Sequence, residues 1–271
     1  MDTFKDIAAR FAVLNTSTLK GCSEEVYAVV DPQDLELKLE SGASAHLLLV
    51  HEKPIETSLK IELEDGAHLS IIELYCGETK CRAEIRQAAN SECEVTHLAF
   101  CGAKCDYTTE LLGGHASSKL QGLFLVGTSD DYTMNLRTNH RVSDCTSDST
   151  LKGVAGGEGC GQFYGLVYVA QDAQRTDAQQ QSRNILLSEE ARIDTKPQLE
   201  IYADDVKCTH GATVGQMDDQ AIYYMRQRGL SLSQARQLQI EGFASDVVRH
   251  CGMEELYEPL MELIHDKMER M

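Results

Sequence analysis

Residues 35–40 read LELKLE, and this stretch decides the fold because its pattern returns 24 residues later. Leu35, Leu37 and Leu39 alternate with charged residues, as expected for a β-strand with one buried face. The copies keep the apolar positions at the same step, first as Leu59, Ile61 and Leu63, then more weakly as Ala83 and Ile85, and finally as Tyr107, Thr109 and Leu111. The sequence therefore predicts a repeated strand.

A turn residue follows the first strand of each copy at the same spacing, at Gly42, Gly66, Asn90 and Gly114. Gly and Asn are the residues that most readily adopt positive φ, so this column predicts a recurring left-handed corner. A second strand-like run follows each corner: HLLLVH (46–51), HLSIIEL (68–74), CEVTHLAF (93–100) and KLQGLFLV (119–126).

A short repeat of strands and turns is typical of a solenoid, in which one rung cannot bury its apolar face but stacked rungs can. Leucine-rich repeats have similar periods, but their L-x-x-L-x-L-x-x-N consensus is not found. We therefore predict a mainly β protein built as a parallel β-helix, with further strands over 161–170, 182–188 and 198–207. The 24-residue step cannot be followed beyond residue 130.

Three segments follow from this pattern: a short N-terminal helical segment (1–20), a parallel β-helix core (21–215) and a C-terminal helical segment (216–271). Asp218 and Asp219 are suited to a helix N-terminus, and Gly229 to its end. A second helix is expected to begin at Ser231 or Ser233 and a third at Glu254. One role for this segment is to cover the open last rung.

Composition excludes several classes of function. A formal net charge of −18 argues against nucleic-acid and anionic-membrane binding, which rely on basic patches. No run of about 18 apolar residues is present, and residues 1–15 lack the apolar stretch of a signal peptide. We therefore expect a cytoplasmic protein whose ten cysteines are mostly reduced core thiols.

The stretch YADDVKCTHGATVG (202–215) contains the strongest candidate site. On a strand, residues i and i+2 point to one face, so Cys208 and His210 would project together, about 7 Å apart. A thiolate and an imidazole are suited to iron–sulfur species or Zn²⁺, and a protonated His210 would lower the thiol pKa. Two ligands do not complete such a site, and an arbitrary C-x-H on a strand is more often ordinary packing.

The other motifs favour structural roles. Cys76 with Cys81, and Cys101 with Cys105, lack a partner pair at a zinc spacing. Histidines in or beside strands, such as His51 and His97, are expected to be exposed or hydrogen-bonded. The Gly-rich stretch 153–161 lacks the Gly-Lys-Ser/Thr of a phosphate-binding loop, so no nucleotide site is expected.

Residues 149–245 resemble the SufB/SufD family, the scaffold proteins of the SUF iron–sulfur cluster assembly system. The matching words are STLKGV (149–154), AQRTDAQQQSRNILLS (173–188), TKPQLEIYADDVKCTHGATVGQMDDQAIYYMRQRGLS (195–231) and ARQLQIEGFAS (235–245). The Cys-x-His-Gly form of KCTHG is closer to SufD than to SufB. The upstream half agrees in its solenoid pattern.

The resemblance implies a right-handed parallel β-helix and a non-enzymatic scaffold. It assigns Cys208 and His210 as metal and cofactor ligands at a subunit interface, where a transient iron–sulfur cluster is built and none is expected on the isolated chain. The implied partners are a SufC-type ABC ATPase, docked by the C-terminal helices, and either a SufB-type scaffold or a second copy in a homodimer.

Two other functions fit a β-helix. A polysaccharide lyase or hydrolase would need acids or basic residues along one solenoid face, and the absence of Trp weakens that interpretation. A structural, self-assembling β-solenoid would need open ends for stacking, and the predicted C-terminal helices argue against it.

Overall fold

The computed structural model describes residues 7–249 and 251–271. The first residues of the predicted N-terminal helical segment, 1–6, lie outside the described residues. Within the rest of that segment the chain already forms two short strands, β1 (Ala12–Val13) and β2 (Thr18–Leu19), and both pair with strands of the solenoid. The range 1–20 is therefore not helical throughout, and the solenoid begins before residue 21.

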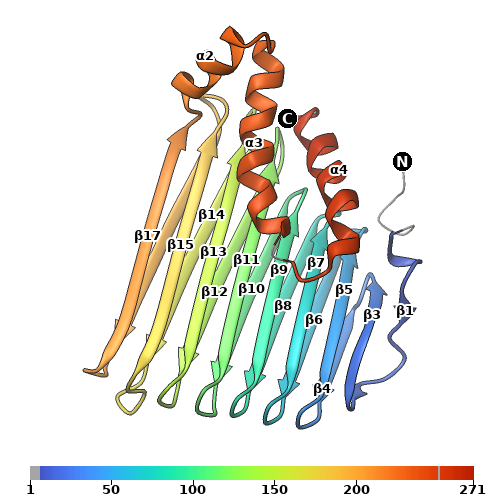
Figure 1. Cartoon of the computed structure of the whole chain (residues 1–271), viewed down its shortest axis with the longest axis vertical. Helices are drawn as coiled ribbons and strands as arrows, with labels where there is room; N and C mark the ends of the chain where they lie inside the picture. The colour runs from blue at the N-terminus through green and yellow to red at the C-terminus, as the bar shows by residue number, and fades with distance from the viewer. Residues whose placement is uncertain (1–6, 250) are drawn as a thin grey trace.

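The described chain forms two parallel sheets through which successive strands alternate, which confirms the predicted β-solenoid. Figure 1 shows the strands side by side in the order of the sequence, with β17 at one margin. The odd-strand sheet contains nine strands, namely β1, β3 (Cys22–Val30), β5 (Ser44–His51), β7 (His68–Tyr75), β9 (Glu92–Ala99), β11 (Ser117–Val126), β13 (Thr146–Ala155), β15 (Thr176–Leu186) and β17 (Val206–Gln216).

The even-strand sheet of the described chain contains eight strands. They are β2, β4 (Asp34–Leu39), β6 (Ile55–Leu63), β8 (Thr79–Gln87), β10 (Ala103–Leu111), β12 (Asp131–His140), β14 (Cys160–Val169) and β16 (Arg192–Ile201). The run 198–207, predicted as one strand, is instead divided by a corner at 202–205 between β16 and β17.

The register explains where the repeat could be followed. Ser44 pairs with His68 and His68 with Glu92, which are steps of 24 residues. From β11 onward the rungs are longer: Ser117 pairs with Thr146 and Thr146 with Asp177, steps of 29 and 31. A fixed period is therefore lost although the strands continue to stack in register.

The left-handed corner column is present, with one displacement. Gly42, Gly66 and Asn90 have φ of 71°, 70° and 56°. In the fourth copy the positive φ (62°) falls on His115 rather than on the predicted Gly114, because the rung from Glu92 to Ser117 has one residue more than the preceding rung.

Alternation along the strands separates two hydrophobic clusters. In β5, Leu47 and Leu49 face the interior between the two sheets, which we call the lumen, whereas Leu48 and Val50 face outward. The lumen of the first rungs is filled by Leu, Ile, Val and Ala side chains. The outward cluster of the odd-strand sheet is equally buried, so another element must cover it.

The C-terminal helices supply that cover. They are α2 (Asp219–Gln227), α3 (Leu232–Arg249), a 3₁₀ turn η1 (Glu254–Leu256) and α4 (Tyr257–Met268), and they follow the predicted boundaries closely. Asp218 accepts hydrogen bonds from the first turn of α2. Ser231 Oγ accepts from Gln234 N while Gln234 Oε1 accepts from Ser231 N, which is a reciprocal capping box at α3.

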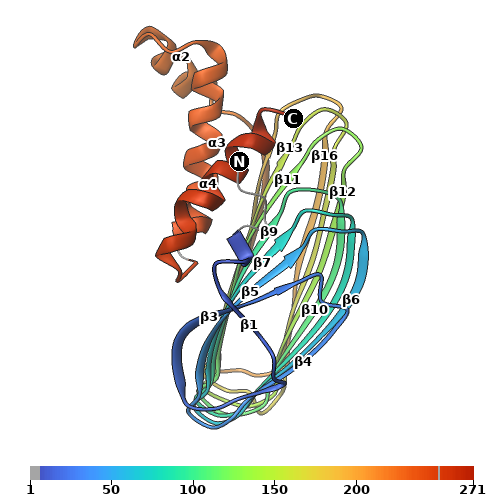
Figure 2. The same cartoon turned by 90° about the vertical axis from the view of Figure 1, so that its right-hand side faces the viewer.

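The position of these helices differs from the expectation. Ile240, Ala244 and Val247 of α3, with Leu260 and Ile264 of α4, pack on the outward cluster of the odd-strand sheet. Figure 2 shows both helices on one side of the flattened coil of strands. They cover a sheet face and leave the last rung open, because the largest unpaired apolar surface lies on that face.

An ion pair between a buried lysine and an exposed aspartate fastens α3 to the sheet. Lys152 on β13 is 5% exposed, and its Nζ donates to Asp246 Oδ2 at 2.8 Å and to the carbonyl oxygen of Phe243 at 2.9 Å. The ammonium also lies 4.9 Å from the centre of the Phe243 ring. Because an unpaired buried cation is costly, these contacts fix where α3 crosses the sheet.

Asp246→Ala should lower the free energy of unfolding by about 1–2 kcal/mol, because the buried Lys152 loses its anion. Adding Lys152→Met should recover most of that loss, since Met fills a similar space without charge. Chemical denaturation of the full chain measures both effects.

The matched control is Glu36→Ala, which breaks the exposed Lys60–Glu36 pair and should change stability by less than about 0.5 kcal/mol. If Asp246→Ala is as mild as this control, the ion pair does not hold α3 in place.

Candidate functional site

Cys208 and His210 both lie on β17, as the spacing predicted. In register, Cys208 pairs with Ala178 and His210 with Gln180. Ala178 and Gln180 are fully buried and face the lumen. Because side chains in register share a face, Cys208 and His210 also face the lumen, and Thr209 points the other way.

The two side chains differ in exposure. Cys208 is half-buried against a small apolar cluster that includes Val167, Val169 and Ala178, whereas His210 is exposed. Burial raises the pKa of the Cys208 thiol, and a backbone hydrogen bond at Ala178 opposes the rise only in part. The lowering of this pKa expected from a protonated His210 is therefore not found, because burial is the largest influence on the thiol.

The site lies at the open end of the solenoid. β16 and β17 form the last rung, and within the described chain each has a strand partner on one side only. Nearly all of β17 is exposed, from His210 to Gln216, and Val214 keeps 42% of its surface. A row of unpaired backbone N–H and C=O groups therefore borders the Cys–His pair.

The two edge strands at this end are not equivalent. β16 contains Pro197, which has no N–H to donate, and charged residues alternate along its outward face. β17 has no proline, and Lys207 is its one residue with a permanent charge. The edge of β17 is thus the better template for another strand.

A second set of ionisable and hydrogen-bonding side chains is enclosed in the lumen. Glu73, 1% exposed, accepts a hydrogen bond at 2.8 Å from His51 Nε2 and another from the Tyr107 hydroxyl. The Tyr132 hydroxyl lies 2.8 Å from His97 Nε2, and burial lowers the His97 pKa to about 4. The prediction of hydrogen-bonded histidines is confirmed for these two residues.

This network does not form a metal site. No group of three or more His, Cys, Asp or Glu side chains in the described residues is arranged to hold a metal ion. Cys81 and Cys105 pair in register and are buried, and burial raises the pKa of both thiols. The sequence analysis did not identify Glu73. It could have been recognised as a carboxylate at an inward-facing position of the repeat, where the neighbouring rungs have Leu49 and His97.

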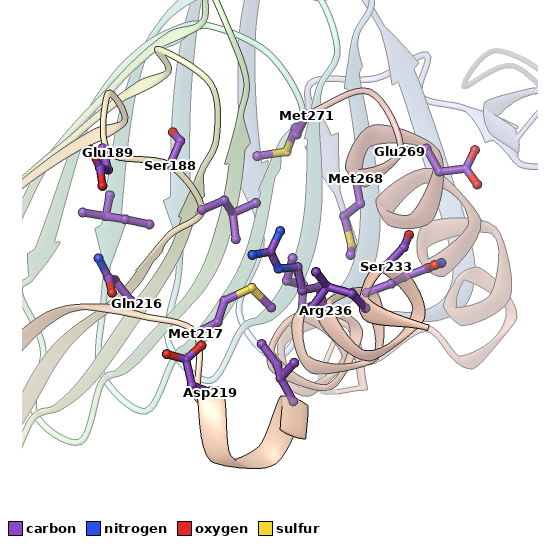
Figure 3. Close-up of a pocket in the computed structure, with 16 residues that line it drawn as sticks. Ser188, Glu189, Gln216, Met217, Asp219, Ser233, Arg236, Met268, Glu269 and Met271 are labelled. Atoms are coloured by element: carbon purple, nitrogen blue, oxygen red, sulfur yellow. The ribbon is translucent and has the colours of Figure 1, made fainter. Parts of the chain in front are cut away.

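A groove of about 720 Å³ lies where α2 and α3 meet the ends of β15 and β17. Figure 3 shows Met217, Met268 and Met271 along it, with Arg236 among them and Asp219 near its rim. Thioether side chains adapt to varied apolar surfaces. The groove is separate from the Cys–His pair, which does not line it.

Large side chains are exposed on the neighbouring helices. Tyr223 and Tyr224 of α2 keep 65% and 59% of their surface, and Leu232 and Leu238 of α3 keep 41% and 50%. We call these four residues the helical patch. Tyr and Arg are enriched where proteins bind each other, and Arg228 donates to the Tyr224 hydroxyl beside the patch.

Comparison with known proteins agrees with this architecture. The family model for the SUF system FeS cluster assembly, SufBD core domain, matches residues 25–243. The iron–sulfur cluster assembly protein SufD of Escherichia coli is 36% identical over 161 residues, which are 59% of this chain and 38% of that protein.

Two further relatives are similar over shorter stretches. The SufBD family protein slr0076 of Synechocystis sp. is 45% identical over 102 residues, 38% of this chain and 22% of that protein. SufD of Bacillus subtilis is 37% identical over 106 residues, 39% and 24% of the two chains. The matched stretches thus span well under half the length of these relatives. Since the family model covers most of the solenoid and reaches into α3, the chain belongs to the SufBD core domain family of the SUF iron–sulfur cluster assembly system and is SufD-like within it.

Proposed function

We propose that this chain is a non-enzymatic scaffold subunit that contributes Cys208 and His210 to a site where a nascent iron–sulfur cluster is built as cargo. One observation carries the proposal: a thiol and an imidazole face the lumen together at the unpaired edge of the last rung. Both groups are established ligands for iron–sulfur species. The names of the relatives, which refer to iron–sulfur cluster assembly, support the same role.

The site is proposed to be completed by a second scaffold chain, either SufB-type or another copy of this chain. Two ligands leave a metal largely solvated, and complete sites usually have four. The described residues offer no third ligand in a metal-binding group, so the remainder must come from a partner. Pairing of a partner strand with β17 would satisfy its free backbone groups and bring new side chains over the lumen.

End-to-end stacking into a filament is a weaker alternative. The sequence suggested that the C-terminal helices would prevent stacking. The structure removes that objection, because the helices leave the last rung open. The two ends do not match, however: β17 has eleven residues, whereas β1 and β2 at the other end have two each. A closed pairing between two copies of the β17 edge satisfies more backbone groups than stacking on the first rung.

The helical patch is the proposed docking surface for a SufC-type ATPase. It contains exposed aromatic and aliphatic side chains outside the solenoid, and Arg226 and Arg228 lie beside it on a chain of net charge −18. Nucleotide chemistry would come from that partner. In this chain the Gly-rich stretch is a packed corner, where a Cβ atom on Gly159 would lie 2.7 Å from the Gly127 carbonyl oxygen.

Assembly of the cluster is proposed to occur in the cytoplasm, as the sequence predicted. The described helices include none long and apolar enough to cross a membrane. One relative, ABCI7 of Arabidopsis thaliana, is named as chloroplastic.

Cys208→Ser or His210→Ala should impair cluster assembly in cells at least tenfold, with melting temperatures within a few degrees of the parent protein, because the open end tolerates small changes. Activity of a cluster-dependent enzyme and thermal melting are the two measurements.

The isolated chain should bind iron weakly, since it supplies two ligands.

Cys22→Ser and His68→Ala are the controls, because both side chains are exposed and far from β17. Normal assembly with a melting temperature several degrees lower would mean that Cys208 and His210 are packing residues and that the proposed site is wrong.

Tyr223→Ser combined with Leu238→Ser should weaken binding to a purified SufC-type ATPase at least tenfold, because two exposed apolar contacts are lost. Far-UV circular dichroism should stay unchanged. Point variants are preferable to removing the helices, since truncation after Gly215 would uncover Leu48 and Ile72.

Leu112→Ser, at an exposed solenoid corner away from the helices, is the control for added polarity. Unchanged binding of the double variant would exclude the helical patch as the docking surface.

A further inference from the structure

We propose that Gln180 is a positioning residue for His210: its side-chain carbonyl accepts the N–H of one imidazole nitrogen and directs the other nitrogen toward the metal. This inference rests on the proposed function, because it assigns a role within the same site. It comes from three observations: the register of β15 and β17, the burial of Gln180, and the absence of a hydrogen-bond partner for its amide among the described residues.

The register places Gln180 directly beneath His210. The two residues are paired between β15 and β17, and the lumen-facing column continues downward from Gln180 to Ser149 and Leu120. Neighbouring strands lie about 4.8 Å apart, which is within reach of a Gln side chain. On the even-strand sheet, Gly165 pairs with Pro197, so Pro197 occupies the same layer as His210.

The side chain of Gln180 crosses the lumen rather than leaving it. It is 0% exposed, and a Cβ atom on Gly165 would lie 2.4 Å from its Nε2 atom. The absence of a side chain at position 165 thus makes room for the amide. Gln180 is held between the two sheets, one rung below the open end.

Neither Oε1 nor Nε2 of Gln180 has a hydrogen-bond partner in the described part of the chain. A buried polar group without a partner is unfavourable, so we expect this amide to find a partner in the assembled site. His210, by contrast, is exposed in the single chain, so packing does not hold its ring in one orientation.

The chemistry of metal-bound histidine supplies the missing partner. A ligating imidazole usually donates its second N–H to a carboxylate, a carbonyl or water, which fixes the tautomer and the ring orientation. Gln180 Oε1 is a carbonyl acceptor without a partner, on the residue paired in register with His210. The amide N–H groups remain available as donors to a sulfide bound in the last rung.

Two nearby polar residues are less suited to the role. Asn184 Oδ1 also lacks a partner among the described residues, but its Nδ2 donates to Ser182 Oγ and to the Thr213 carbonyl oxygen, and Asn184 pairs in register with Val214 rather than with His210. Thr195 has an unpaired Oγ1 among the described residues but lies on β16, in the opposite sheet. Gln180 alone among these three is paired in register with His210.

The test uses Co²⁺ as the probe, titrated into this chain co-purified with its second scaffold chain, with the thiolate-to-cobalt absorption band as readout. Gln180→Met keeps the shape of the side chain but removes the acceptor, and should weaken Co²⁺ binding about 10–100-fold. Gln180→Glu keeps the acceptor and should retain binding within about threefold of the parent complex. Gln179→Met, exposed on the opposite face of β15, is the matched control and should leave binding unchanged.

The positioning role is supported if Gln180→Met weakens Co²⁺ binding while Gln180→Glu and Gln179→Met do not. A packing role alone would not favour Glu over Met. Equal weakening by both variants overturns it in favour of a steric role, and parent-like binding by Gln180→Met overturns it outright. If Cys208→Ser and His210→Ala also bind Co²⁺ like the parent complex, the proposed site itself is wrong. If Gln180→Met does not fold, Gln180→Glu decides: loss of binding in that folded variant refutes the inference.

Discussion

The structure depends on backbone pairing between parallel rungs. Each strand satisfies its N–H and C=O groups through the strands before and after it in the same sheet, and no rung can do so within itself. Backbone pairing is therefore complete in the interior rungs, whereas each strand at an end of a sheet has a partner on one side only. At one end of the solenoid the terminal strands β1 and β2 have only two residues each. At the opposite end the terminal strand β17 has eleven. An unsatisfied strand of that length is an edge on which another strand can pair.

The C-terminal helices do not cover that open end. They could have covered the last rung, but they pack on the outward face of the odd-strand sheet, where Leu48, Ile72 and Leu98 form a continuous apolar surface. Hydrophobic burial is roughly proportional to area, so the broad sheet face outweighs the narrow end. Lys152 then fixes α3 on that face through Asp246. The second half of α3 and α4 therefore complete the core, while the helical patch on α2 and the first half of α3 remains exposed.

The lumen also changes along the solenoid. Its first rungs are apolar around the enclosed Glu73 network, in which the carboxylate accepts hydrogen bonds from His51 and Tyr107. Toward the open end the lumen-facing positions become Ser149, Gln180 and His210. A polar lumen is unfavourable for a simple core, and the amide of Gln180 lacks a partner among the described residues. Gln180 and His210 lie where the proposed second chain would close the solenoid, so their polar groups could still find partners there.

The sequence by itself determined the repeated unit, the parallel solenoid and the helical C-terminus. Strand alternation, positive-φ corners and helix caps are local properties, so Leu35 to Leu39, Gly42, Asp218 and Ser231 were sufficient to predict them. It also placed Cys208 and His210 on one face of one strand, since that follows from the two-residue period of a strand.

The tertiary structure decided what depends on contacts between distant residues. Longer rungs after β11 preserve the register while abolishing the fixed period, and the added residue before Ser117 moved the corner from Gly114 to His115. The surface that the helices cover could not be read from their amphipathic pattern, because that pattern shows which helix face is buried but not which surface of the solenoid it packs on. The placement of Gln180 beneath His210 follows from a register across 30 residues of sequence, which stacking of the rungs fixes and local pattern does not.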